Sequence, residues 1–128
     1  MTLLLDTHAL LWSFLDDPKL SPTARQAITS MGRKVLVSPA SLWEVAIKIS
    51  VGKYRIPQPF EDFMKKQLVG HNFDLLPISI SHMARVITLP FHHRDPFDRL
   101  IIAQALVEEI PVVSVDLLFD GYGVERVW

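Results

Sequence analysis

The chain has 128 residues, 49% of them hydrophobic, with 13 basic and 14 acidic side chains, which gives a formal net charge of −1. A chain of this length buries roughly two thirds of its unfolded surface, so residues 1–128 are expected to fold as a single domain without disulfides or a structural metal. The zero cysteine count excludes a disulfide scaffold, a thiolate zinc site and a cysteine nucleophile, and the near-neutral charge excludes nucleic-acid binding by general polycationic character.

The chain begins with the apolar segment MTLLLDTHALLWSFL. Its hydrophobicity suggests a secretory signal, but the segment has no cationic start, and Asp6 and His8 interrupt it before any small-residue cleavage site. No later stretch approaches the roughly 18 uninterrupted apolar residues of a membrane span. The segment is therefore expected to be folded core, and the protein is expected to be soluble and cytoplasmic, without membrane association.

Short apolar runs alternate with longer segments of helical periodicity along the chain. Strands are predicted over residues 3–5, 34–37, 73–76, 112–115 and 124–127. Helices are predicted over residues 9–15, 22–30, 41–51, 60–69, 82–89 and 96–109, with N-caps at Ser21, Ser81 and Asp95. This alternation predicts an α/β fold in which a central parallel β-sheet has helices on its faces.

Two acidic residues directly follow predicted strands. Asp6 ends the run LLL, and Asp116 ends the run VVSV. If these strands are neighbours in a parallel sheet, their carboxylates emerge at the same edge, which is where open α/β sheets bind ligands. Glu44 lies early in the helix after the second strand, and Asp98 lies in the first turn of the helix over 96–109. All four acids are candidates for one site.

Four converging carboxylates without a balancing cation raise one another's pKa values unless a divalent ion supplies the missing charge. Oxygen ligands select a hard ion, and carboxylate with water suits Mg²⁺ or Mn²⁺. In nucleases such ions generate hydroxide from water and stabilise the phosphodiester transition state. The four acids therefore predict a metal site of this kind.

Each acidic residue also has a purely structural interpretation. Asp6 suits the N-cap of the helix that follows it, and Asp98 complements the dipole of its helix. Glu44 and Lys48 are spaced as an i,i+4 surface ion pair on the polar side of their helix. Asp95, which precedes a proline, is expected to be an N-cap rather than a metal ligand.

Basic residues are concentrated in the middle of the chain. Residues 31–66 contain seven basic and three acidic side chains, whereas the last 62 residues contain four basic and eight acidic ones. The tripeptide Lys53-Tyr54-Arg55 combines charge with an aromatic ring that can stack on an unpaired base. The tripeptide His92-His93-Arg94 is expected to be either a phosphate-contacting loop or a solvated turn. One face of the protein is therefore expected to be cationic.

Four segments in this order and spacing resemble the PIN-domain family, specifically its VapC-type toxins: LLLDTHALLW, SPASLWEVAIK, HRDPFDRLIIAQA and VVSVD. The resemblance spans almost the whole chain. It implies a PIN-like fold with helices on both faces of the parallel sheet, and a Mg²⁺- or Mn²⁺-dependent endoribonuclease that cleaves single-stranded regions of RNA. Carried over by position, the three core acids are Asp6, Glu44 and Asp98, and Asp116 matches a more variable fourth acid. Thr7 matches a small hydroxyl residue that helps to orient a ligand.

The resemblance also implies partners and a mechanism. A homodimer and a VapB-like antitoxin that covers the active groove are expected. A metal-bound water would attack the scissile phosphate in line and leave 5′-phosphate and 3′-hydroxyl ends. Together with Thr7, the candidates for RNA contact are the basic residues Lys48, Lys53, Arg55, Arg94 and Arg99.

Two other functions are compatible with part of this pattern. Phosphatases that use an Asp-x-Asp pair also place an aspartate at a strand end, but the residue two positions after Asp6 is His8, so the acid of the pair is missing. The remaining alternative is a non-catalytic PIN-fold interaction protein that dimerises and binds a partner. Metal binding distinguishes the enzyme from this scaffold.

Overall fold

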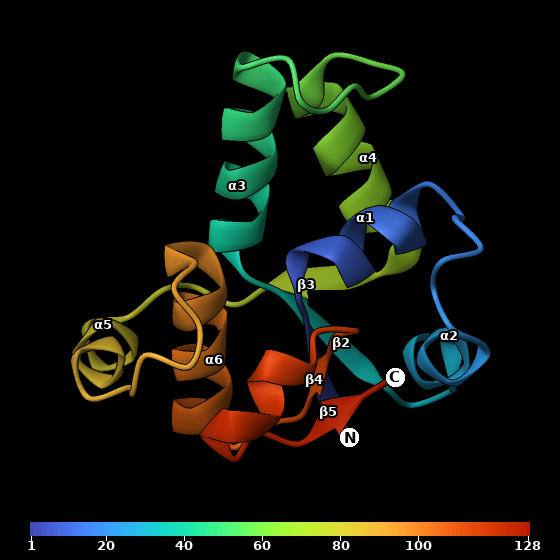
Figure 1. Ribbon diagram of the computed structural model, residues 1–128. Helices are drawn as coiled ribbons and strands as arrows, with labels where there is room; N and C mark the ends of the chain where they lie inside the picture. The colour runs from blue at the N-terminus through green and yellow to red at the C-terminus, as the bar shows by residue number, and fades with distance from the viewer.

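The computed structural model describes all 128 residues as an α/β fold, with five parallel strands in the order β3-β2-β1-β4-β5 and seven helices (Figure 1). The strands are β1 (Thr2–Leu5), β2 (Lys34–Val37), β3 (Phe73–Leu75), β4 (Val112–Val113) and β5 (Arg126–Val127). The helices are α1 (Thr7–Phe14), α2 (Pro22–Thr29), α3 (Pro39–Ser50), α4 (Phe60–His71), α5 (Ile80–Ile87), α6 (Pro96–Glu108) and the 3₁₀ helix η1 (Leu117–Tyr122).

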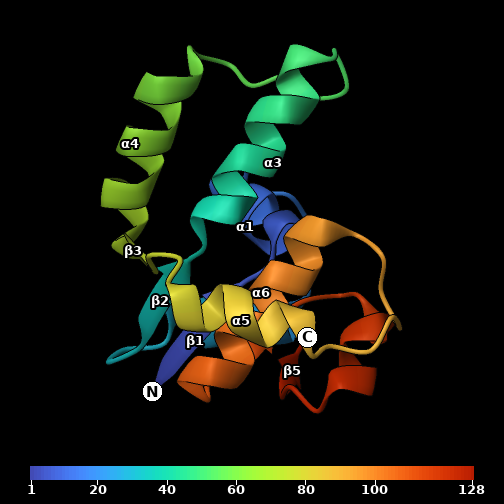
Figure 2. The ribbon, with the colours of Figure 1, turned by 90° about the vertical axis from the view of Figure 1, so that its left-hand side faces the viewer.

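Alternate residues of the central strand β1 face two separate hydrophobic cores. Leu3 and Leu5 belong to the larger core, which also includes residues of α1, α2 and α4. Leu4 belongs to the second core, which is built mainly from α6 and η1. Because successive side chains of a strand point to opposite faces of the sheet, helices cover both faces, as predicted. Figure 2 shows α5 and α6 lying together on one side.

The sheet register brings three strand ends to the same edge. Leu5 of β1 pairs with Val37 of β2 and with Val113 of β4, and all of these pairings are parallel. The segments that follow these three residues therefore leave the sheet side by side. This edge contains Asp6 directly after β1 and the N-terminus of α3 directly after β2.

Helices α3 and α4 extend beyond this edge of the sheet as a helical pair, joined by the irregular segment 51–59 (Figure 1). The first turn of α3 is fixed by Ser38, whose Oγ accepts a hydrogen bond from the Ala40 amide at 3.1 Å. Pro39 occupies the first helical position, where the missing N–H has no partner to lose. The two helices therefore lie beyond the carboxyl ends of the strands (Figure 1).

All five strands and the six α-helices are predicted in the right places, with differences at their ends. Helix α5 begins at Ile80, and its N-cap is Ser79 rather than Ser81, because the His82 ring accepts a hydrogen bond from the Ser79 amide and completes a capping box. Strand β4 is only two residues long, and η1 was not predicted. No helix has both the length and the apolar character needed to cross a membrane.

Candidate metal centre

Asp6 is the N-cap expected from the sequence, and it lies at the sheet edge where a metal ligand is expected. It follows β1 at the sheet edge, and its Oδ1 accepts a hydrogen bond from the Ala9 amide at 2.8 Å as the N-cap of α1. The side chain is buried. Burial raises the pKa of its carboxyl group above the ordinary value of 3.8, although hydrogen bonds from Ser114 and the Ala9 amide act in the opposite direction. A buried carboxylate whose hydrogen-bond donors are all uncharged favours a nearby cation.

Glu44 lies in α3 and is buried, with both carboxylate oxygens occupied. Oε2 accepts a hydrogen bond from Lys48 Nζ at 2.8 Å, so the predicted i,i+4 pair forms, but the Glu44 side chain is only 7% exposed and the pair is not a surface pair. Oε1 accepts a hydrogen bond from the Thr7 hydroxyl at 2.7 Å. The expectation of RNA contact at Thr7 is corrected, because the residue is buried and its hydroxyl orients Glu44 instead.

Asp95 and Asp98 begin α6 next to Glu44. Asp95 is the N-cap, as predicted, because its Oδ1 accepts hydrogen bonds from the amides of Phe97 at 2.8 Å and Asp98 at 3.1 Å. Although Asp95 caps the helix, its side chain also belongs to the acidic cluster. Glu44, Asp95 and Asp98 each place a carboxylate oxygen within 4.8 Å of the others.

Asp98 has a strongly perturbed carboxyl group. Burial and then the negative charge of Asp95, followed by the charges of Asp6, Glu44 and Asp116, raise its pKa from 3.8 to about 8. The charge on these acids is therefore not balanced by the protein's own cations. This imbalance fits a divalent cation, and an all-carboxylate donor set fits Mg²⁺ or Mn²⁺.

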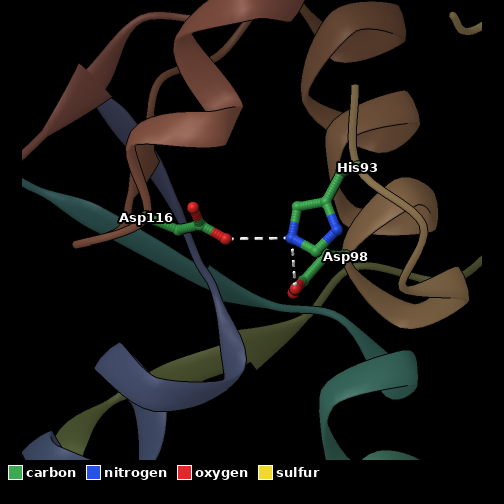
Figure 3. A group of neighbouring side chains, drawn as sticks. All are labelled: His93, Asp98 and Asp116. Carbon is green, nitrogen blue, oxygen red and sulfur yellow. Dashed lines mark hydrogen bonds and ion pairs between the residues drawn. The ribbon is translucent and has the colours of Figure 1, made fainter. Parts of the chain in front are cut away.

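His93 joins the site, which the sequence did not reveal (Figure 3). Its Nε2 donates a hydrogen bond to Asp116 Oδ2 at 2.9 Å and lies 3.0 Å from Asp98 Oδ2. The ring points inward rather than into solvent, and its side chain is 12% exposed. The only signal in the sequence is its position two residues before the N-cap Asp95, whose amide donates to His93 Nδ1 at 3.2 Å.

Asp116 approaches the cluster from the loop after β4. Its Oδ1 accepts a hydrogen bond from the Leu118 amide at 2.9 Å as the N-cap of η1. Asp6, Asp95 and Asp116 are thus all N-caps. In each of them Oδ1 accepts the backbone hydrogen bond, and Oδ2 takes no part in the cap. Asp98 and Asp116 both lie close to His93, and Glu44 and Asp95 lie close to Asp98. Asp6 lies near enough for its negative charge to contribute to the raised pKa of Asp98.

The basic residues expected to contact RNA differ in their surroundings. Lys53, Arg55 and Arg94 are exposed. Lys48 is half-buried and paired with Glu44, and its Nζ lies 5.1 Å from the centre of the Tyr54 ring. The three exposed residues keep their predicted role as candidates.

The expectation that Arg99 steers RNA is corrected. Arg99 is buried, and its guanidinium donates hydrogen bonds to backbone carbonyls of the segment that leads into α6. The acceptors are Pro90 at 2.8 Å, Leu89 and His93 at 3.2 Å, and Val86 at 3.3 Å. A guanidinium surrounded by carbonyl acceptors is satisfied inside the protein, so Arg99 fixes the loop that contains His93.

A family model described as the PIN domain matches residues 3–124. VapBC2 from Rickettsia felis, bound to a DNA fragment from its promoter, has a similar structure, with a TM-score of 0.73 at 14% identity over 100% of both chains. VapBC-1 from nontypeable Haemophilus influenzae gives a TM-score of 0.66 at 15% identity over 98% of this chain and 96% of its own. A toxin-antitoxin complex from Klebsiella pneumoniae gives 0.60 at 18% identity over 88% of this chain and 85% of its own.

At these identities the structural likeness shows the fold alone. No curated protein matches the chain in sequence. The family model nevertheless spans nearly the whole sheet and every acidic residue of the cluster. The chain therefore belongs to the PIN domain family.

Proposed function

We propose that this protein is a metal-dependent endoribonuclease toxin of the VapC type that cleaves single-stranded regions of RNA. The observation that supports the proposal best is the unbalanced carboxylate cluster at the carboxyl ends of β1 and β4, where the pKa of Asp98 is raised to about 8. The negative charge would be neutralised by Mg²⁺ or Mn²⁺, held by Asp6, Glu44, Asp98 and Asp116. When bound, such a cation supplies Lewis-acid activation of a scissile phosphate and acidifies the attacking water.

The side chains around the cluster prepare it for this task. Thr7 and Lys48 fix the two oxygens of Glu44, so its carboxylate cannot rotate freely. The amides at the starts of α1 and α6 orient Asp6 and Asp95. Such preorganisation supports catalysis because the ligands need not rearrange as the reaction proceeds.

Substrate binding is proposed to involve the exposed cations outside the cluster. Lys53 and Arg55 belong to the segment between α3 and α4, and Arg94 belongs to the loop before α6. Both segments flank helices that contribute acids to the site. Exposed cations in this position would bind the RNA backbone and compensate for the acidic cluster, which repels phosphate.

We also propose a homodimer and a VapB-like antitoxin that neutralises the toxin, in line with the toxin-antitoxin complexes to which the fold is similar. Helix α5 presents Ile80, Met83 and Ile87 on one face, and these side chains are 82%, 50% and 84% exposed. An apolar stripe of this kind is typical of a surface that another protein covers. Sedimentation of a monomer at tens of micromolar would contradict the dimer.

The cleavage of a labelled single-stranded RNA tests the enzyme assignment. We expect cleavage with Mg²⁺ or Mn²⁺, none in excess EDTA, and recovery when the ion is restored. Asp6→Asn should abolish cleavage while the asparagine still caps α1, whereas the matched surface variant Asp62→Asn on α4 should cleave like the wild type. Full activity of Asp6→Asn, or of the wild type in EDTA, would refute the mechanism. Absence of Mn²⁺ binding together with tight antitoxin binding would favour the non-catalytic scaffold.

A further inference from the structure

We propose that His93 is a positioning residue of the metal centre: its Nε2–H holds Asp116 beside Asp98, and this proton stays on the ring when the cation binds. The inference rests on the proposed function, because it concerns the same carboxylates. It assigns His93 as a hydrogen-bond donor to the carboxylates that bind the metal, and not as a ligand of the metal itself.

The tautomer of His93 is set by its neighbour in the sequence. The Asp95 amide donates a hydrogen bond to Nδ1 at 3.2 Å, so Nδ1 presents a lone pair and the ring proton lies on Nε2. Nε2 then donates to Asp116 Oδ2 at 2.9 Å. If Nε2 bound a metal, the ring proton would lie on Nδ1. The Nδ1–H group would then face the N–H group of Asp95, and the hydrogen bond between them would be lost. The surroundings therefore favour a donor over a ligand.

The backbone of His93 is anchored independently of the carboxylates. Its amide donates to the Tyr122 hydroxyl at 2.7 Å, and its carbonyl accepts from Arg99 at 3.2 Å. The edge of the ring packs against Phe119, with the ring centres 6.0 Å apart. These contacts come from α6 and η1, the two elements that begin next to Asp98 and Asp116. His93 is thus held in place by contacts other than those with the carboxylates, and its Nε2 contacts both Asp98 and Asp116.

Apart from its contact with His93, Asp116 is held only by hydrogen bonds within its own segment. Its other hydrogen bonds are local, from the Leu118 amide to its Oδ1 at 2.9 Å and from its own amide to Ser114 Oγ at 3.0 Å. Its side chain is 33% exposed, compared with 20% for Asp98. Without His93, no other hydrogen bond in the structure would connect Asp116 with Asp98, so their carboxyl groups would be free to separate in the metal-free protein.

Calorimetric titration of the full-length protein with MnCl₂ tests this role. We expect His93→Ala to weaken Mn²⁺ binding by about 10- to 100-fold, the range found when an outer-shell hydrogen bond to a metal ligand is removed. His93→Gln carries an amide donor at a similar reach and should recover most of the affinity. His92→Ala, which removes an exposed neighbour that contacts the Tyr122 ring, is the matched control and should bind like the wild type. Thermal melts in EDTA check that each variant folds.

Nitrogen NMR of the imidazole gives a second readout that a merely structural role would not produce. We expect a protonated Nε2 in the metal-free protein and the same protonation state after saturation with Mg²⁺. Loss of the Nε2 proton on Mg²⁺ binding, or failure of His93→Gln to recover affinity that His93→Ala loses, would overturn the proposal. Equal Mn²⁺ affinity of His93→Ala and the wild type would overturn it while leaving the proposed function intact. No Mn²⁺ binding by the wild type would refute both.

Discussion

Replacing Asp98 by asparagine is expected to stabilise the metal-free protein, although the same change should abolish metal-dependent activity. The folded protein holds the Asp98 carboxyl group in its protonated form up to a pKa of about 8, against 3.8 for the ordinary group. In the unfolded chain the carboxyl ionises from about pH 4 upwards. Between these two values the unfolded state has released a proton that the folded state retains, so the stability of the wild type falls as the pH rises.

The size of the effect follows from the same pKa values. Each pH unit within this window costs about 1.4 kcal/mol, so the cost is about 4 kcal/mol at pH 7 but only about 1.6 kcal/mol at pH 5. These are upper limits, because the side chain remains 20% exposed. Asparagine does not ionise. Its stability advantage over the wild type should therefore grow by up to about 3 kcal/mol between pH 5 and pH 7, and should level off above pH 8.

Urea denaturation in EDTA at several pH values measures this difference. Comparing pH values cancels any pH-independent effect of the substitution on packing or hydrogen bonding, so that only the effect of ionisation remains. Asp62→Asn, at an exposed position of α4, is the control. The difference between its free energy of unfolding and that of the wild type should not change with pH. With saturating Mg²⁺ the order should reverse, because only the wild type gains the binding energy of the ion. A gap between Asp98→Asn and the wild type that does not change with pH would refute the reasoning.

Three further predictions concern residues around the cluster. Asp95→Ala should lose about 1 kcal/mol in urea denaturation because the cap bonds disappear, whereas Asp95→Asn should keep the cap and lower the pKa of Asp98 as followed by NMR. Arg99→Met should lose about 3 kcal/mol or more, because buried backbone carbonyls such as that of Leu89 lose their donor; a loss below 1 kcal/mol in the same measurement would refute the anchoring role. The double variant Lys53→Gln with Arg55→Gln should reduce the salt dependence of single-stranded RNA binding by about 1.4 in log–log slope, with unchanged Mn²⁺ affinity; an unchanged slope would remove both residues from the interface.

The fold is largely accessible from the sequence because its elements depend on local patterns. Apolar runs such as residues 3–5 need burial on both faces, and that need specifies central parallel strands. The ends of elements are less accessible. Ser79 was missed as the cap of α5 because the capping box depends on the His82 ring, whose second nitrogen contacts Glu108 26 residues away in the chain.

The acidic positions could be predicted from their placement after strands, but the surroundings of each side chain could not. Glu44 lies on the polar face of α3, and a helical pattern does not distinguish a face exposed to water from one turned toward a polar site. Arg99 and His93 have side chains that are usually exposed. The burial of Arg99 depends on carbonyl acceptors in the segment from the end of α5 to His93, and that of His93 depends on the carboxylate of Asp116, 23 residues away. No periodic pattern in the sequence reports such contacts.

The N-caps of α1 and α6 stabilise the fold in a way that does not require a bound metal ion. Asp6 and Asp95 are held by backbone amides, and each of these helix starts has a partial positive charge of about half an elementary charge. This charge belongs to the peptide groups, so no chelator can extract it and no competing ion can exchange with it. The two caps therefore stabilise the folded chain whether or not a metal ion is bound. Removal of the ion would therefore abolish the proposed activity without removing these contributions to the stability of the fold.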